Sequence, residues 1–137
     1  MIVLDTNVLS EPLKSLPEEK LVEWLDNQSA ETLSITAITR AEFRFGVLRL
    51  PDGQRKNQLA VQVERTLALF ANRTLDFDTA AADKLEEIAV ASERAGKRAV
   101  APDAYIAACA AARCFAVATR NVSHFAHMGV RVIHPWD

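Results

Sequence analysis

The sequence is short of the residues that mark several classes of protein. It has two cysteines, four glycines, five prolines and one tyrosine in 137 residues. Two cysteines are too few for a disulfide-stapled scaffold, and the low glycine and proline content excludes collagen-like and low-complexity chains. Cys109 and Cys114 lie in one helical stretch, where an offset of five residues points them to different faces. We expect two free, mostly buried thiols.

Long hydrophobic runs and a strong charge of either sign are also missing. The N-terminal apolar run covers only residues 1–4 and has no basic region before it, which predicts neither a signal peptide nor a membrane span. We therefore expect a cytoplasmic protein with no membrane partner. The net charge of −2 excludes a globally basic nucleic-acid coat protein but leaves room for a local basic strip. Hydrophobic residues make up 50% and charged residues 25%, as in an ordinary globular domain.

Apolar segments alternate between strand-like and helix-like patterns along the chain. The pattern predicts strands at 1–4, 32–35, 74–77, 115–118 and 130–133. It predicts a helical turn at 8–12 and helices at 18–27, 36–50, 54–71, 79–95 and 103–113. Such alternation is typical of an α/β fold with a mainly parallel sheet of about five strands, covered by helices on both faces. We expect residues 1–137 to form a single domain.

Three acidic residues stand where a carboxylate could carry chemistry. Asp5 follows the first apolar run, Glu42 lies in the expected helix 36–50, and Asp103 begins an alanine-rich helix. Each also has a simpler interpretation. Asp5 could be a helix cap, Glu42 a solvated helical side chain, and Asp103 a charge that complements the helix dipole. If the three converge, their repulsion raises their pKa values unless a hard divalent cation lies among them. Such a cation can activate water for attack on a phosphodiester.

Polar residues after the first and fourth strands are candidate supports, because ligands of parallel sheets bind beyond the carboxyl ends of strands. Asn7 follows the first strand, and Asn121 and Ser123 follow the fourth, where they could complete the site as neutral ligands or through water. His124 is open to three interpretations, a surface side chain, a substrate contact or a metal ligand. His127 follows three residues later, but no cysteine or further histidine completes a zinc set, so we expect no zinc site.

Basic residues gather in the segment 40–56. Five arginines and lysines stand there against two acidic residues, a surplus of three positive charges around Glu42 that would attract a phosphate backbone. Arg40 and Arg44 lie within one helical turn of Glu42, so we expect them to contact RNA. Arg49 and Arg55 are better explained as part of a solvated helix face. Arg120, at the end of the fourth strand, is a third expected RNA contact.

Four segments in this order resemble the PIN-domain ribonuclease toxins of the VapC family, in its FitB-like branch. They are IVLDTNVLSE, ITAITRAEFRFGVLRLPDGQR, PDAYIAACA and the closing ATRNVSHF with GVRVIHPW. The resemblance spans nearly the whole chain and implies a Rossmann-like α/β/α sandwich with Mg²⁺- or Mn²⁺-dependent endoribonuclease activity. It also implies a cognate VapB/FitA-like antitoxin that blocks the site, and we expect a homodimer within a larger toxin–antitoxin complex.

The same resemblance assigns roles to individual residues. Asp5, Glu42 and Asp103 match the acidic metal-site positions of the family, and Thr6 and Thr119 match its hydroxyl-bearing support positions. Many members carry a further acidic residue in the loop after the fourth strand, where this chain has Asn-Val-Ser-His at 121–124. A missing carboxylate leaves less negative charge to hold a second metal ion.

Two other functions fit the same residues. A phosphate-accepting signalling module would also use an acidic pocket at strand ends, but it would want a lysine after a late strand, where this chain has Thr119 and Arg120. In a catalytically silent binding module the carboxylates would only cap helices, and loss of metal binding in Asp103→Ala would argue against it. Trp24 and the leucine-rich stretch 59–69 are candidate partner surfaces, although such residues more often lie in a core.

Overall fold

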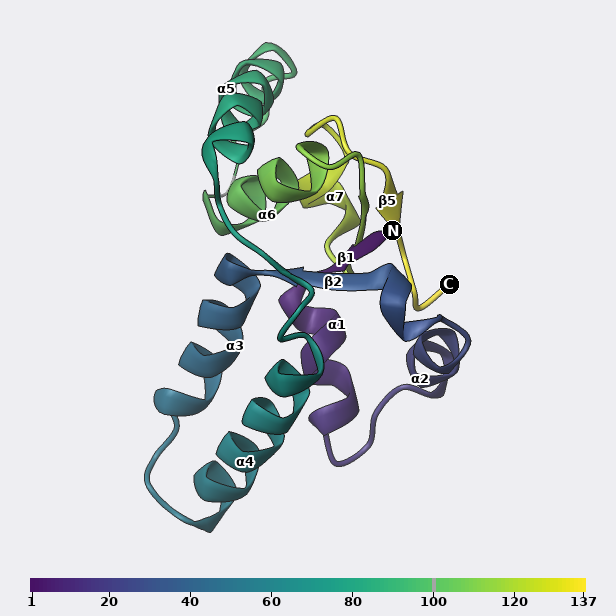
Figure 1. Ribbon diagram of the computed structural model, residues 1–137, viewed down its shortest axis with the longest axis vertical. Helices are drawn as coiled ribbons and strands as arrows, with labels where there is room; N and C mark the ends of the chain where they lie inside the picture. The colour runs from purple at the N-terminus through teal and green to yellow at the C-terminus, as the bar shows by residue number, and fades with distance from the viewer. Residues whose placement is uncertain (100) are drawn as a thin grey trace.

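A five-stranded parallel sheet forms the centre of the computed structural model, which describes residues 1–99 and 101–137 (Figure 1). The strands are β1 (Ile2–Leu4), β2 (Leu33–Thr36), β3 (Thr74–Leu75), β4 (Ala116–Ala118) and β5 (Val132–Ile133). Their order in the sheet is β3-β2-β1-β4-β5, and each neighbouring pair runs parallel. The predicted parallel α/β fold is confirmed.

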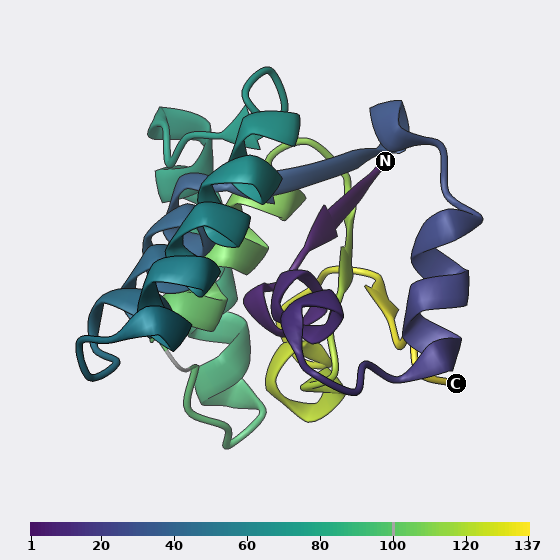
Figure 2. The same cartoon turned by 90° about the horizontal axis from the view of Figure 1, so that it is seen from below.

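Helices connect the strands and cover the sheet. They are α1 (Thr6–Ser10), α2 (Glu19–Asp26), α3 (Ala37–Leu48), α4 (Gln54–Leu69), α5 (Thr79–Arg94), α6 (Ala101–Ala111) and α7 (Val122–Phe125), with 3₁₀ turns η1 (Glu11–Leu13) and η2 (Ala30–Thr32). Both views of the ribbon show α3 and α4 lying alongside each other (Figures 1 and 2). Most predicted boundaries lie within two residues of the observed ones.

The two faces of the sheet carry separate hydrophobic cores. Neighbouring residues of a strand point to opposite faces, so Val3 joins one core and Leu4 joins the other. The core around Val3 includes buried residues of α5, α6 and α7, and the core around Leu4 includes buried residues of α1, α2, α3 and α4. Because both faces of the sheet are covered, β1, β4 and β5 consist of apolar residues alone.

The alanine-rich helix α6 begins at Ala101, two residues before the predicted start, with Pro102 in its first turn. Ala104, Ala107 and Ala108 are buried in the core around Val3. Their small side chains let α6 approach its neighbours closely, above all α5, with which it packs most extensively. The same packing fixes the position of Asp103 in the first turn.

The two cysteines differ in environment, which corrects one expectation. Cys109 is buried in α6, and burial raises the pKa of its thiol to about 11. Cys114 is exposed, because it sits in the turn after α6 with a left-handed backbone (φ 58°) that takes it off the helix. The prediction of mostly buried thiols is therefore right for Cys109 and wrong for Cys114.

The stretches proposed as partner surfaces are core on one side and exposed on the other. Trp24 packs against the core around Leu4, and Val63 and Leu67 of α4 are buried in it. Val61 and Leu69 lie on the outer side of α4 and are exposed. Within the described residues, no helix combines the length and the apolar character that crossing a membrane requires.

Candidate active site

Asp5 lies at the carboxyl end of the central strand β1, where the chain turns into α1. Its side chain is buried and caps α1, with Oδ1 accepting the backbone N–H of Thr6 at 2.8 Å. Its Oδ2 accepts the Thr119 hydroxyl at 2.7 Å and the Asn7 side-chain amide at 3.3 Å. Burial raises the pKa of Asp5 above its ordinary value, although the hydrogen bonds from Thr119 and Thr6 oppose this shift. The helix-cap interpretation is thus correct, but it leaves a costly buried charge.

Glu42 approaches Asp5 from the helix that follows β2. Thr36 ends this strand and caps α3, where its hydroxyl accepts the N–H of Thr39 at 3.0 Å. In the second turn of the helix, Glu42 is half-buried and its Oε1 accepts the Thr6 hydroxyl at 2.9 Å. Burial raises the pKa of Glu42, and the charges of Asp5 and Asp103 raise it further. Glu42 is therefore not the freely solvated helical side chain of the simpler interpretation.

Asp103, in the first turn of α6, is the third carboxylate beside Asp5 and Glu42. The side chain is only 13% exposed, and its Oδ2 lies 2.8 Å from Nδ1 of His124. His124 belongs to α7, which follows β4. Its side chain is partly exposed and at the same time contacts the carboxylate of Asp103. The structure thus places His124 beside Asp103, and its role as a substrate contact or a metal ligand stays a prediction.

The three carboxylates face one cavity of about 370 Å³. Thr6, Asn7 and Asn121 also line this cavity, which we call the carboxylate cavity. The carboxylate cavity lies beyond the carboxyl ends of β1 and β4. From β1 the chain continues to β2 and β3 on one side of the sheet, whereas β4 and β5 lie on the other side of β1, so the strand order reverses between β1 and β4. Open parallel sheets bind ligands at such a switch point. Residues far apart in sequence thus form one acidic site.

The predicted supports are brought together to different degrees. Asn7 and Thr119 hold Asp5, and Thr6 holds both Asp5 and Glu42. Asn121 lines the cavity, and its backbone N–H donates to the Thr119 hydroxyl at 3.0 Å. Ser123 is exposed on α7 and is not among the residues that line the cavity.

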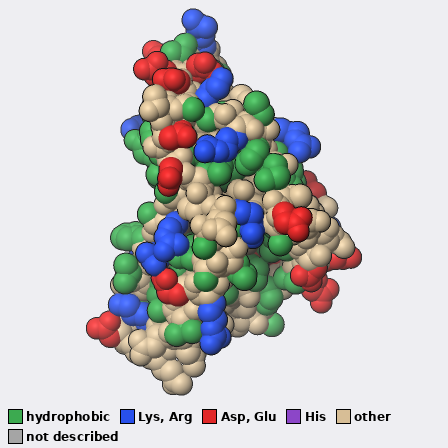
Figure 3. Space-filling view, viewed as in Figure 1, with side chains coloured by type: hydrophobic (Ala, Val, Ile, Leu, Met, Phe, Trp, Pro, Cys, Tyr) green, Lys and Arg blue, Asp and Glu red, His purple; other side chains and the backbone are tan. Residues whose placement is uncertain are grey.

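The arginines expected to contact RNA also differ. Arg44 is bound by both carboxylate oxygens of Glu64 on α4, at 2.8 and 2.7 Å, and neither Arg40 nor Arg44 lines the cavity. Lys56 pairs with Asp52 at 3.0 Å. Arg120 does line the cavity. On the face drawn in Figure 3, lysines and arginines are scattered among acidic and hydrophobic side chains.

Sequence reasoning missed three residues of the cavity, Ser10, Glu11 and Lys14. Glu11 is buried, and its position four residues after Asn7 put it on the same face of a continuing helix. That spacing was visible in the sequence. Lys14 is held by Glu11 at 2.7 Å, a contact that could not be foreseen without the turn η1.

The donors in the cavity suit a hard divalent cation, because they are carboxylate, hydroxyl and amide oxygens without a thiol. Among the residues that the structure describes, no three acidic, histidine or cysteine side chains are already gathered closely enough to hold a metal ion. Burial is the main cause of the raised pKa of Asp5 and of Glu42, and repulsion between the carboxylates adds to it and opposes such gathering. A bound cation would remove this repulsion and draw the carboxylates together.

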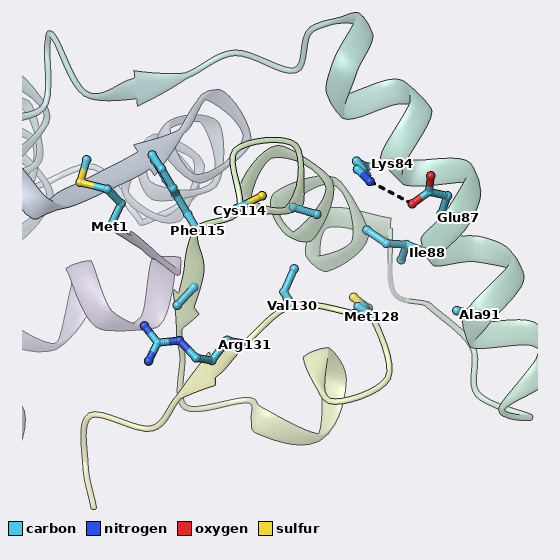
Figure 4. A pocket seen from close by; sticks show the side chains of 13 residues that line it. Met1, Lys84, Glu87, Ile88, Ala91, Cys114, Phe115, Met128, Val130 and Arg131 are labelled. Carbon is cyan, nitrogen blue, oxygen red and sulfur yellow. Dashed lines mark hydrogen bonds and ion pairs between the residues drawn. The ribbon is translucent and has the colours of Figure 1, made fainter.

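A larger cavity of about 610 Å³ lies at the other end of the sheet, beside Met1 and Ala116 (Figure 4). Side chains of α5 and of the segment 128–131 line it, and Lys84 and Glu87 pair at its edge at 3.2 Å. No residue expected to form the site lines this cavity. Chemistry, and not size, therefore identifies the candidate site.

Comparison with known proteins gives a consistent result. The family model of the PIN domain matches residues 2–130. Toxin FitB of Neisseria gonorrhoeae is 44% identical over 137 residues, which cover 99% of each chain. The VapC ribonuclease Y4jK of Sinorhizobium fredii is 41% identical over 138 residues, covering 100% of this chain and 99% of that protein. The crystal structure of FitAcB from Neisseria gonorrhoeae matches with a TM-score of 0.94 and 44% identity over 99% of each chain.

Proposed function

The chain belongs to the PIN-domain family, and on that premise we propose that it is a divalent-metal-dependent endoribonuclease that acts as the toxin of a toxin–antitoxin pair. One observation carries the proposal, which is the convergence of Asp5, Glu42 and Asp103 on one cavity at the switch point of the sheet. Ribonucleases with this domain generally depend on a divalent metal. We infer that the metal is Mg²⁺, with Mn²⁺ as a substitute, because the donors are hard oxygens.

Asp5, Glu42 and Asp103 would hold the metal. When bound, it supplies a water nucleophile of lowered pKa and positive charge for the phosphoryl group. Thr119 and Asn7 fix the orientation of the Asp5 carboxylate, and Thr6 fixes that of Glu42. Such supports keep carboxylates in position for catalysis, and losing one typically costs about 10- to 100-fold in affinity or activity. Arg120 at the rim would hold the RNA backbone.

The partner that we propose is a VapB/FitA-like antitoxin that covers the carboxylate cavity. The similarity to Toxin FitB supports this proposal. We also propose a homodimer within the larger complex. The exposed Val61 and Leu69 of α4 and the exposed Phe45 and Leu48 of α3 are apolar side chains that such contacts could cover.

The test is cleavage of a mixed RNA pool by antitoxin-free protein in Mn²⁺. We expect cleavage by the wild type, no cleavage in EDTA, and a loss of about 100-fold or more in Asp5→Asn, because this change keeps the side-chain shape and removes the charge. Asp83→Asn makes the same change at an exposed position of α5 and should cleave like the wild type.

The opposite results have distinct meanings. Cleavage that survives EDTA would contradict metal dependence. If no RNA is cut although calorimetry detects metal binding, the phosphate-accepting and silent binding alternatives are favoured instead.

A further inference from the structure

Glu11 is a buried carboxylate to which the proposed reaction gives no task. It is only 2% exposed, begins η1 directly after α1, and lines the carboxylate cavity. A buried charge is costly unless it is paired and hydrogen-bonded. Its partners therefore indicate what the residue does.

The carboxylate of Glu11 binds two cations and one backbone amide. Oε2 lies 2.7 Å from Nζ of Lys14 and 3.8 Å from the guanidinium of Arg120, and Oε1 accepts the backbone N–H of Glu18 at 3.1 Å. The hydrogen-bonded Lys14 ammonium lowers the pKa of Glu11, so the carboxylate stays ionised at neutral pH. One buried anion thus connects two cations that come from opposite ends of the sequence.

The two cations are fixed in place and still accessible. The Arg120 guanidinium lies 4.2 Å from the centre of the Trp136 ring, and the backbone N–H of Arg120 donates to Asn7 Oδ1 at 3.2 Å. The side chains of Lys14 and Arg120 remain 53% and 40% exposed. The ammonium of Lys14 and the guanidinium of Arg120 are therefore accessible to a ligand.

Arg120 also pairs with a competing partner, the carboxylate of Glu18. The side chain of Glu18 is 56% exposed. Exposed ion pairs are weak, so a phosphate that approaches Arg120 can replace Glu18 at little cost. Glu11 is buried and cannot be displaced in this way. It would keep both cations in position when a ligand arrives.

Lys14 and Arg120 line the same cavity as the three metal-site carboxylates. An RNA backbone that enters the cavity meets negative charge on the carboxylate side and needs positive charge beside it. We propose that Glu11 is a positioning residue that holds Lys14 and Arg120 at the cavity rim, where the two cations bind phosphates beside the bond that is cut. This inference rests on the proposed ribonuclease function and adds a substrate-binding element to it.

The test compares steady-state cleavage of a single-stranded RNA oligonucleotide by wild type and Glu11→Gln at saturating Mn²⁺. Glutamine keeps the volume and the oxygen that accepts the Glu18 amide, but it no longer attracts the two cations. We expect KM to rise about tenfold and kcat to stay within about twofold, because only binding outside the reacting bond is weakened. We also expect the dependence of log KM on log salt to flatten by about 0.7 for each phosphate that the variant no longer binds.

Two surface variants test the same idea if Glu11→Gln does not fold. Lys14→Ala and Arg120→Ala should each raise KM on their own. Where Glu11→Gln does fold, Lys14→Ala should raise KM less in the Glu11→Gln background than alone. Lys20→Ala removes an exposed cation from α2 and should leave KM and kcat unchanged.

Several results would overturn the proposal. One is a fall in kcat with KM unchanged in Glu11→Gln, which indicates a different role. Another is a wild-type KM and salt dependence in both Lys14→Ala and Arg120→Ala. Wild-type cleavage is measured first. Its absence overturns the ribonuclease function and this inference together, whereas normal cleavage with unchanged KM in the variants overturns the role of Glu11 alone.

Discussion

At the scale of single residues, the ionised forms of Asp5 and Glu42 are disfavoured by the metal-free fold. Burial raises the pKa of both carboxyl groups, and neighbouring carboxylates add to the shift. An acid whose pKa is raised by folding weakens the folded state wherever it is ionised. The site therefore contains unfavourable charge that a bound cation would relieve, which is common at functional sites.

Glu42→Gln should stabilise the metal-free protein. The gain in melting temperature, a few degrees in EDTA at neutral pH, is full above the raised pKa of Glu42. It disappears as pH falls below the ordinary value of 4.5, where the carboxyl group is protonated in both the folded and the unfolded state. Thermal unfolding over a pH series measures it. Glu86→Gln at an exposed position of α5 is the control, and a lower melting temperature for Glu42→Gln would contradict the argument.

His124 lies in the segment 121–124 after β4, where many members of the family were expected to carry an additional acidic residue and this chain has none. Its ring lies 2.8 Å from Asp103, so a carboxylate at position 124 would be beside the proposed metal site. His124→Asp should tighten Mn²⁺ binding about tenfold, as an added anionic oxygen ligand does for hard cations. Calorimetry measures the affinity, and Ala126→Asp adds the same charge just after α7. Equal affinities for wild type and His124→Asp would count against a metal site at this position.

At the scale of elements, each site residue is placed by the start of a helix. Asp5 caps α1, Thr36 caps the helix that carries Glu42, and Asp103 lies in the first turn of α6. Helix starts fix side-chain positions because the cap sets the angle at which the helix leaves the strand. The caps of α3 and α5 offer a matched comparison, since α5 carries no residue of the site.

Thr36→Ala and Asp78→Ala both remove a capping oxygen, so each should lower the free energy of unfolding by about 1 to 2 kcal/mol. Only Thr36→Ala should also reduce kcat/KM, by about tenfold, because α3 aims Glu42 at the cavity and small misplacements are costly in catalysis. Denaturant unfolding and RNA cleavage measure the two effects. Equal losses of activity in both variants would show that stability, and not the aim of α3, decides activity.

At the scale of the whole molecule, metal binding and folding should be linked. Three carboxylates from α3, α6 and the end of β1 face one cavity, so a cation bound there joins distant parts of the chain. A metal at about one hundred times its Kd adds about 2.7 kcal/mol, or roughly 8 °C in melting temperature for a chain of this size. Asp103→Ala should lose most of this shift, and EDTA should reverse it. A full shift in Asp103→Ala would place the metal elsewhere.

The sequence was sufficient to predict the parallel sheet and the helices around it. A strand or helix that is buried on one side repeats its hydrophobic residues with the period of that element, and this spacing is visible in the sequence. The apolar run before Asp5 indicated that Asp5 ends a strand, and the alanines after Asp103 indicated that Asp103 begins a helix. Their convergence with Glu42 came from the resemblance to a family, since no local pattern says which strand ends meet. The structure brings the three residues together around one cavity.

Side-chain partners were decided only by the tertiary structure. The charge of Arg44 is taken up by Glu64 on the next helix, which a count over segment 40–56 could not include. Cys114 is exposed because its turn leaves the helix, and Glu11 meets Arg120 from the other end of the sequence only after β1 and β4 have paired. Hydrophobic period is a local property of a chain, whereas the pairing of charges depends on distances that exist only once the elements have packed.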